Sequence, residues 1–229
     1  MSLRPRQLAL ALDHAESYAR EDFLSGPCNQ DAVRLIDCWP DWPDNAVALI
    51  GPEGSGKTHL AMIWAAAAGA RVISARSLNE AEIPAALATG ALVVEDAGTT
   101  SADRALFHLI NLAREERASL LLTARTPPAT WPLSVPDLVS RLRALPLATL
   151  QAPDDVMLRA VIVKLAADRQ LALDEAVVRY LSLHIERSFA AARAAVIALD
   201  NEALRRRRPV SRALAAEIFG DRREARASQ

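Results

Sequence analysis

The sequence predicts an α/β fold in which a mainly parallel sheet is flanked by helices and is followed by a small all-α domain. Short apolar segments alternate with segments of helical spacing through the first two thirds of the chain, and such alternation is typical of a parallel sheet. A glycine-rich phosphate-binding motif stands between the first predicted strand and the helix after it. Beyond Gln151 only helical patterns remain.

Each predicted strand is a short apolar run, partly β-branched, that ends at turn residues. Strands are expected at residues 46–50, 71–74, 91–95, 119–123 and 145–150. The spacing of apolar residues predicts helices between them, over 57–68, 80–88, 102–116 and 136–143. In the last third, helices are expected over 154–169, 174–184, 188–206 and 211–219, with Asp or Ser at three of the N-caps.

These patterns divide the chain into four parts. They predict an N-terminal segment over residues 1–20, the α/β domain over 21–152, the all-α domain over 153–220 and a basic tail over 221–229. At 229 residues and 51% hydrophobic, the chain is long and apolar enough to bury the core of one large domain or of two small ones.

The charge balance excludes a protein whose whole surface neutralises phosphates, because the net charge is -1 and the isoelectric point is about 6.4. The charge is uneven, however. Residues 205–229 carry eight arginines against three acidic residues, a local charge of +5, which leaves -6 on the first 204 residues. Two interpretations stay open for this basic end: a local site for an anion, or a solvated helix terminus.

A cytoplasmic location with no membrane partner is expected. The longest apolar run, residues 60–70, falls well short of the roughly 20 residues that span a bilayer. The first twelve residues lack the apolar stretch of a secretory signal. Two cysteines, Cys28 and Cys38, are too few for a disulfide framework and fit a reducing compartment.

The strongest chemical signal is the motif G-x-x-x-x-G-K-[ST], which lies between a predicted strand and a predicted helix. Glycines let backbone N–H groups turn around phosphate oxygens, and the helix presents its positive dipole end to the same anion. Lys57, one of only two lysines, would reach the outer phosphates, and the Thr58 hydroxyl would ligate Mg²⁺. The motif consists of Gly51, Pro52, Glu53, Gly54, Ser55, Gly56, Lys57 and Thr58.

A second group on the metal side is expected where the apolar strand at residues 91–95 ends in two carboxylates, Glu95 and Asp96. One of them should complete the metal shell while the other orients water. The sequence does not decide which of the two carboxylates takes which role.

Two arginines outside the motif are further candidates. Arg141 lies in a short predicted helix before the last strand, where it could serve as an arginine finger in another subunit's site or be a surface arginine. Arg193 lies between Phe189 and Ile197 on an apolar line of a C-terminal helix and therefore needs a partner. That partner is either a bound phosphate or a local carboxylate.

With these residues in place, the chain resembles the DnaA branch of the AAA+ ATPases, and within it the short Hda-type regulators, over about residues 7–219. Phe23-Leu-Ser-Gly-Pro-Cys-Asn-Gln-Asp-Ala32 is similar to the F-x-x-G-x-x-N-x-x-A segment that lies near the adenine in this branch. The resemblance places Glu95-Asp96 at Walker B, residues 121–128 at sensor 1, Arg141 at the arginine finger and Arg193 at sensor 2.

The resemblance implies an AAA+ phosphate-loop sheet with a helical lid, and a site for ADP or ATP with Mg²⁺. To the motif residues it adds Phe23, Asn29, His59 and Arg193 as nucleotide contacts. Two departures from the family pattern predict weak intrinsic hydrolysis or none. Glu95 stands where Walker B normally begins with Asp, and the sensor 1 Asn or Asp is replaced near Arg125, which leaves the role of Thr123 open.

The resemblance also implies two protein partners. Gln7-Leu-Ala-Leu-Ala-Leu12 resembles the peptide by which Hda-type proteins dock on the DNA sliding clamp. An extended segment could offer the Gln7 amide and place Leu8, Leu10 and Leu12 against the clamp, with the last two in an apolar pocket. Arg141 would then act on the ATP of the initiator DnaA, so that this chain is an activator of DnaA's hydrolysis and contacts DNA only through the clamp.

Three other functions compete with this hypothesis. The chain could be a self-contained DnaA-like ATPase or loader whose C-terminal arginines contact DNA. It could be a phosphate-loop kinase for a small metabolite, although the all-helical last third is poorly explained by that function. It could also be a scaffold that is insensitive to nucleotide. Homo-oligomerisation stays open.

Overall fold

A computed structural model of the chain describes residues 18–99 and 103–220. The described chain divides into two compact units, an α/β unit that ends at Pro153 and a helical unit that begins at Asp154. Each unit has its own hydrophobic core.

The α/β unit is built on a sheet of five parallel strands in the order β2-β3-β4-β1-β5. The strands are β1 (Ala46–Ile50), β2 (Arg71–Ser74), β3 (Ala91–Glu95), β4 (Ser119–Ala124) and β5 (Leu147–Thr149). All residues of β1 are buried because helices cover both of its faces, which explains its uninterrupted apolar sequence. The register places Leu49 of β1 opposite Thr123 of β4, so the carboxyl ends of these strands lie side by side.

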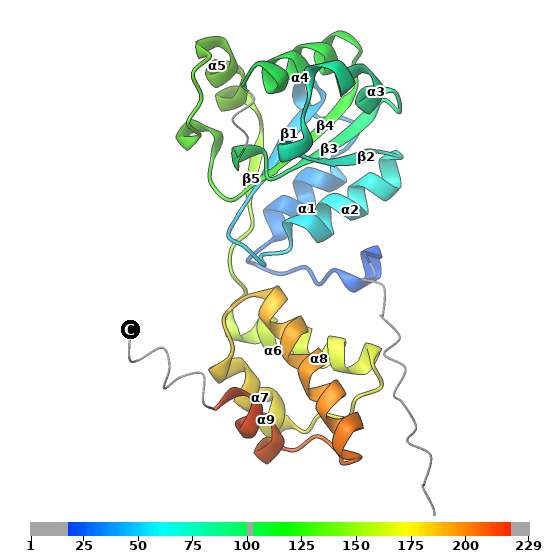
Figure 1. Ribbon diagram of the computed structural model, residues 1–229, viewed down its shortest axis with the longest axis vertical. Helices are drawn as coiled ribbons and strands as arrows, with labels where there is room; N and C mark the ends of the chain where they lie inside the picture. Colours follow the sequence, from blue (N-terminus) through cyan, green and yellow to red (C-terminus); the bar gives the residue numbers. More distant parts are fainter. Residues whose placement is uncertain (1–17, 100–102, 221–229) are drawn as a thin grey trace, which may run out of the picture. The chain divides into compact units, whose positions relative to one another are not determined.

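Helices form a layer on each face of this sheet (Figure 1). One face carries α1 (Gln30–Asp37) and α2 (Lys57–Ala68). The other carries α3 (Ile83–Leu87), α4 (Asp103–Glu115) and α5 (Pro136–Ala144). Short 3-10 turns lie at Arg20–Asp22, Pro43–Asn45, Ala75–Ser77, Glu80–Glu82, Ala97–Thr99 and Pro128–Thr130.

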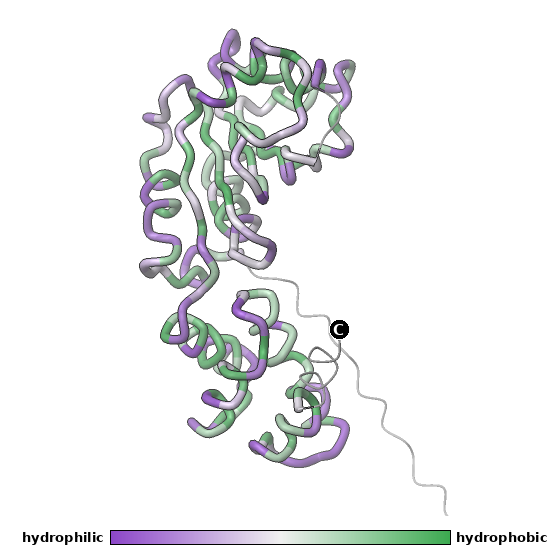
Figure 2. Tube along the Cα trace, turned by 90° about the vertical axis from the view of Figure 1, so that its left-hand side faces the viewer, coloured by the Kyte–Doolittle hydropathy of each residue, from purple (hydrophilic) through white to green (hydrophobic). Residues whose placement is uncertain are grey.

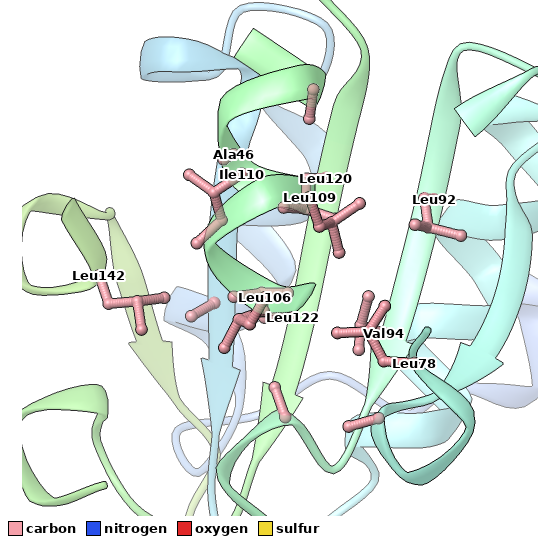
Figure 3. Close-up of a cluster of buried hydrophobic side chains, with 14 of the residues drawn as sticks. Ala46, Leu78, Leu92, Val94, Leu106, Leu109, Ile110, Leu120, Leu122 and Leu142 are labelled. Atoms are coloured by element: carbon pink, nitrogen blue, oxygen red, sulfur yellow. The ribbon is translucent and has the colours of Figure 1, made fainter. Parts of the chain in front are cut away.

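The two faces of the sheet bury alternate residues of the same strands. Figure 3 shows Leu92 and Val94 of β3 and Leu120 and Leu122 of β4 on the face that packs against α4. Val47, Leu49, Val93 and Leu121 point to the opposite core, beneath α1 and α2. Along the chain, hydrophobic residues concentrate in the strands, and the helices alternate between hydrophobic and hydrophilic residues (Figure 2). Two opposed cores therefore hold the sheet between its helices.

Four helices make the second unit: α6 (Asp155–Asp168), α7 (Glu175–His184), α8 (Phe189–Arg206) and α9 (Arg212–Phe219). Each begins with a side-chain cap, because Asp154, Asp174, Ser188 and Ser211 each accept a hydrogen bond from a backbone N–H of the first turn. In residues 18–99 and 103–220, no helix is both long and apolar enough to cross a membrane.

The fold differs from the sequence-based prediction at three elements. Residues 145–150 were expected to form one strand, but β5 begins only at Leu147, since Pro146 has no N–H to donate and joins the sheet only through its carbonyl, which accepts from Ala48 N at 2.9 Å. The helix expected over 80–88 is a 3-10 turn followed by the short α3, which carries a proline in its first turn. Helix α1 was not predicted.

Candidate functional site

The loop between β1 and α2 has a backbone that only glycines adopt without strain. Gly54 and Gly56 have φ angles of 70° and 94°, in the left-handed region. A Cβ atom on Gly51 would lie 2.4 Å from the Leu150 carbonyl oxygen, so a side chain there would collide with the backbone after β5. This backbone geometry is typical of a concavity lined by N–H groups that binds anions at the start of a helix.

Lys57 is held across the entrance of this loop. Its side chain is buried, and its Nζ donates to the carbonyl oxygens of Gly51 and Pro52, both at 2.8 Å. Burial lowers the pKa of Lys57 from its ordinary value, an effect that the nearby carboxylate of Asp96 opposes and the guanidinium of Arg125 supports. The ammonium is thus a partly desolvated cation, which strengthens its attraction for an anion.

The two carboxylates predicted from the sequence lie at the same edge of the sheet as the loop. Thr58 Oγ1 donates to Glu95 Oε2 at 2.8 Å, and Thr123 Oγ1 donates to Glu95 Oε1 at 3.3 Å. The Thr123 hydroxyl also accepts from the Asp96 backbone N–H at 3.1 Å. Asp96 has a φ of 56°, a left-handed conformation that Asp tolerates better than most residues. Thr123, which is buried, therefore positions both acidic residues.

Thr58 and Glu95 supply adjacent oxygen atoms, the ligand type that Mg²⁺ takes in phosphate sites. Across the described ranges, no cluster of three or more His, Cys, Asp or Glu residues could hold a metal by itself. The two adjacent oxygens of Thr58 and Glu95 fit a cation that receives its other ligands from phosphates and water rather than from a protein cage.

The segment before α1 brings two of the expected nucleotide contacts close to α2. The Phe23 and His59 rings meet edge to face, with centroids 5.3 Å apart. Asn29 is buried and uses its side-chain amide to shape the segment: Oδ1 accepts from Gly26 N, and Nδ2 donates to the Leu24 carbonyl, both at 2.9 Å. The segment is also tied to the end of the sheet, because Gln151 N donates to the Cys28 carbonyl.

One charged residue at this site was missing from the sequence-based set. Arg125 follows directly after β4, and its Nη2 lies 2.8 Å from Glu53 Oε2 in the phosphate loop. Its position just after a predicted strand was the available signal, since the carboxyl ends of strands border ligands in α/β sheets.

Arg141 lies on α5, outside this group. The charged residues that shift the Lys57 pKa are Asp96, Arg125, Glu95 and Glu53. The guanidinium carbon of Arg141 instead lies 5.8 Å from the centre of the Phe107 ring on α4. This distance is within the range of a cation–π contact, which would hold the half-buried side chain against its neighbour.

The loop before α5 is fixed to α4 by a carboxylate. Asp103 accepts hydrogen bonds from both the backbone N–H and the hydroxyl of Ser134, each at 2.6 Å. The Ser134 hydroxyl in particular holds the pKa of Asp103 below its ordinary value of 3.8. These bonds order the segment that leads into the helix of Arg141.

Replacing Asp103 by alanine should lower the free energy of unfolding by about 1–3 kcal/mol at neutral pH, because Ser134 loses its charged acceptor. The stabilisation by a carboxylate with a lowered pKa is complete above its ordinary pKa and is lost as the pH falls through the lowered value. Urea denaturation should therefore show a difference between Asp103→Ala and the wild type that shrinks below about pH 4. The exposed Glu116→Ala serves as the control, and an equal loss in it would contradict the assignment.

Arg193 belongs to the helical unit, where it is half-buried on α8. Gln7, Leu8, Leu10 and Leu12, expected to bind the clamp, lie outside the described residues. The structure thus gathers the phosphate loop, the carboxylates of Glu95 and Asp96, and the segment of Phe23 and Asn29 within one unit.

Similarity to solved structures identifies the fold. Domain III of the replication initiation protein DnaA from Thermotoga maritima superposes with a TM-score of 0.75 at 20% sequence identity, covering 89% of this chain and 96% of that one. A DnaA bound to AMPPCP and single-stranded DNA gives a TM-score of 0.67 at 20% identity, covering 83% of this chain and 68% of that one. A variant of RuvB from Thermotoga maritima gives a TM-score of 0.69 at 15% identity, covering 88% of this chain and 70% of that one.

No protein-family model matches the sequence, and no curated protein does. At these identities the structural likenesses establish the fold, which is the DnaA-like AAA+ fold expected from the sequence. The narrower resemblance to Hda-type regulators stays a prediction.

Proposed function

We propose that this chain binds an adenine nucleotide with Mg²⁺ at the loop of residues 51–58 and acts as a regulator of replication initiation. The observation that carries the nucleotide site is the hydrogen-bonded row Thr58–Glu95–Thr123 beside a glycine loop that buries Lys57. The loop would bind the phosphates through its N–H groups, and Lys57 would contact the outer ones.

The contacts divide the roles of the two carboxylates. Glu95 shares a hydrogen bond with the Thr58 hydroxyl, so we assign Glu95 and Thr58 to the metal side. A bound Mg²⁺ would neutralise phosphate charge. Asp96 is fixed through its backbone N–H rather than through Thr58, and we assign its carboxylate to the orientation of water.

Slow hydrolysis by the chain itself fits this arrangement. Arg125, which lies in the sensor 1 segment, is engaged with Glu53 of the loop. We propose that the chain instead promotes hydrolysis of ATP bound to DnaA, with Arg141 stabilising the charge that develops on the phosphates. Its support is the family resemblance together with the placement of Arg141 on α5, where Phe107 holds the guanidinium. Docking on the sliding clamp through Gln7, Leu8, Leu10 and Leu12 completes the proposal.

Thermal unfolding tests the nucleotide site. A ligand that binds only the folded state at 100 times its Kd adds about 2.7 kcal/mol, which shifts the Tm of a unit of this size by roughly 5–10 °C. We expect ADP or ATP with Mg²⁺ to produce such a shift and AMP to produce little. An unchanged Tm with all three nucleotides would favour the nucleotide-insensitive scaffold.

Co-elution with the purified sliding clamp tests the second partner. Changing Gln7 and Leu10 to alanine should abolish co-elution without altering the nucleotide-dependent Tm, because neither residue is among those proposed to bind the nucleotide. Retained co-elution would refute the assignment of this segment.

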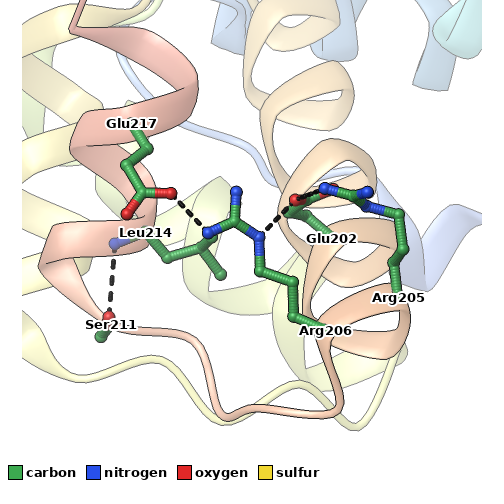
Figure 4. Close-up of polar contacts among 6 residues, drawn as sticks. All are labelled: Glu202, Arg205, Arg206, Ser211, Leu214 and Glu217. Carbon is green, nitrogen blue, oxygen red and sulfur yellow. Dashed lines mark hydrogen bonds and ion pairs between the residues drawn. The ribbon is translucent and has the colours of Figure 1, made fainter.

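A self-contained ATPase that acts on DNA is the second candidate, because residues 205–229 carry a local charge of +5. The structure engages two of these arginines with carboxylates: Glu202 pairs with Arg205 and Arg206, and Arg206 also pairs with Glu217 (Figure 4). Hydrogen bonds from Arg205 and Arg206 lower the pKa of Glu202 to about 2, so its carboxylate stays charged at neutral and mildly acidic pH. DNA binding without clamp that weakens steeply with salt would favour this candidate.

A further inference from the structure

The mouth of the phosphate loop contains an acidic residue that a phosphate site does not need. Glu53 lies in the third position of the motif, and its carboxylate pairs with Arg125 at 2.8 Å across the loop. Both side chains are largely exposed, at 76% and 58%. Ion pairs this exposed contribute little to folding stability, so a stabilising role does not explain why these two residues are paired.

Both residues lie close enough to the Lys57 ammonium for their charges to act on it. Glu53 and Arg125 are among the few groups whose charges shift the pKa of the Lys57 ammonium, in opposite directions. In this motif the loop N–H groups hold the inner phosphates, and the lysine reaches the β- and γ-phosphates. An anion that extends past Lys57 therefore meets the Glu53–Arg125 pair, whereas a shorter one contacts it less.

We propose that the Glu53–Arg125 pair sets the preference of this site between nucleoside diphosphate and triphosphate. The inference rests on the proposed nucleotide site and deepens it. Arg125 has donors for two partners at once, because its guanidinium carries five N–H groups. It can thus neutralise Glu53 and donate to a terminal phosphate. Without Arg125, the carboxylate of Glu53 faces the terminal phosphate uncompensated and repels it.

Titration calorimetry with ADP and with the non-hydrolysable AMPPCP, both with Mg²⁺, tests this proposal. Arg125→Met should weaken AMPPCP binding by about tenfold or more, the value of a lost charge-assisted hydrogen bond to phosphate. ADP binding should weaken by less than about threefold, since the diphosphate ends nearer to Lys57. Arg125→Lys should restore most of the AMPPCP affinity because it keeps the positive charge.

The acidic partner should give the opposite effect. Glu53→Gln removes the repelling carboxylate, so AMPPCP should bind more tightly while ADP changes little. In the Glu53→Gln background, the loss caused by Arg125→Met should be smaller than in the wild type, because no carboxylate is left exposed. A double-mutant cycle measures this coupling.

A matched control is present in the same unit. Arg114 and Asp44 form another exposed ion pair, with N and O atoms 3.7 Å apart and side chains 61% and 69% exposed. Arg114→Met and Asp44→Asn should change neither affinity. Circular dichroism of every variant confirms that the unit is folded.

The outcomes separate this inference from the proposed function. If the wild type binds neither nucleotide, the nucleotide site itself fails. The site stands if the wild type binds both nucleotides in a Lys57-dependent way. Only the role of the Glu53–Arg125 pair is then overturned if Arg125→Met leaves the ratio of ADP affinity to AMPPCP affinity unchanged, or if the double-mutant cycle shows no coupling. A changed ratio with coupling, rescued by Arg125→Lys, supports it.

Discussion

Replacing Lys57 by alanine is expected to weaken the binding of both ADP and ATP by about 100-fold, because the ammonium makes charge-assisted hydrogen bonds to the outer phosphates. The side chain is already buried and directed at the loop, so little ordering is needed on binding. Fluorescence titration with labelled ADP and ATP measures the two affinities.

The second lysine of the chain offers the control for this experiment. Lys164 pairs with Asp168 one turn further along α6 in the helical unit. Lys164→Ala should therefore bind nucleotide as the wild type does. Since Lys57→Ala also removes the donor to two loop carbonyls, Lys57→Arg provides a second variant that keeps the charge. Wild-type affinity in both Lys57 variants would refute the site.

Arg141→Ala should reduce the hydrolysis of DnaA-bound ATP by about a thousandfold, the lower end of what an arginine finger supplied by a partner contributes. The assay contains the sliding clamp loaded on DNA, DnaA with labelled ATP, and this chain. Nucleotide binding by this chain should persist, because Arg141 is not among the charges that act on Lys57.

The neighbouring Arg143 gives a matched comparison, since it lies exposed on the same helix two residues away. Arg143→Ala should retain most of the stimulation. Equal losses in both variants would indicate a general role of the positive charge of α5, and undiminished hydrolysis with Arg141→Ala would remove the finger assignment.

Much of the α/β unit could be predicted because local pattern and tertiary structure agree there. The first three strands and α2 have the predicted bounds. The buried strands β1 and β3 are nearly continuous apolar runs, the more exposed β2 has a β-branched pair between Arg71 and Ser74, and the phosphate motif marks where α2 begins. The edge strand β5 was predicted too long because residues 145–150 are mostly apolar, and this pattern does not show that Pro146 lacks the N–H that strand pairing needs. Helix α1 was missed although Ala32, Val33 and Ile36 have the spacing of a buried helical face, because two turns give a short signal.

At the site, the sequence identified residue types, and the structure identified their partners. The phosphate motif and the apolar strand that ends in Glu95 and Asp96 predict that these carboxylates lie near the loop, but only the contacts distinguish the residue bonded to Thr58 from the one held by its backbone. The pairing of Glu53 with Arg125 joins residues 72 positions apart, and both are exposed polar residues without a periodic pattern. Such a contact arises from the order of strands in the sheet, which the sequence pattern alone does not specify.

Equilibrium dialysis of the unmodified chain against ADP with Mg²⁺ tests the proposed nucleotide site without a variant or a partner protein, because it counts bound ligand. We expect saturation near one nucleotide per chain and competition by ATP. Failure to retain either adenylate, with or without the metal ion, would contradict it.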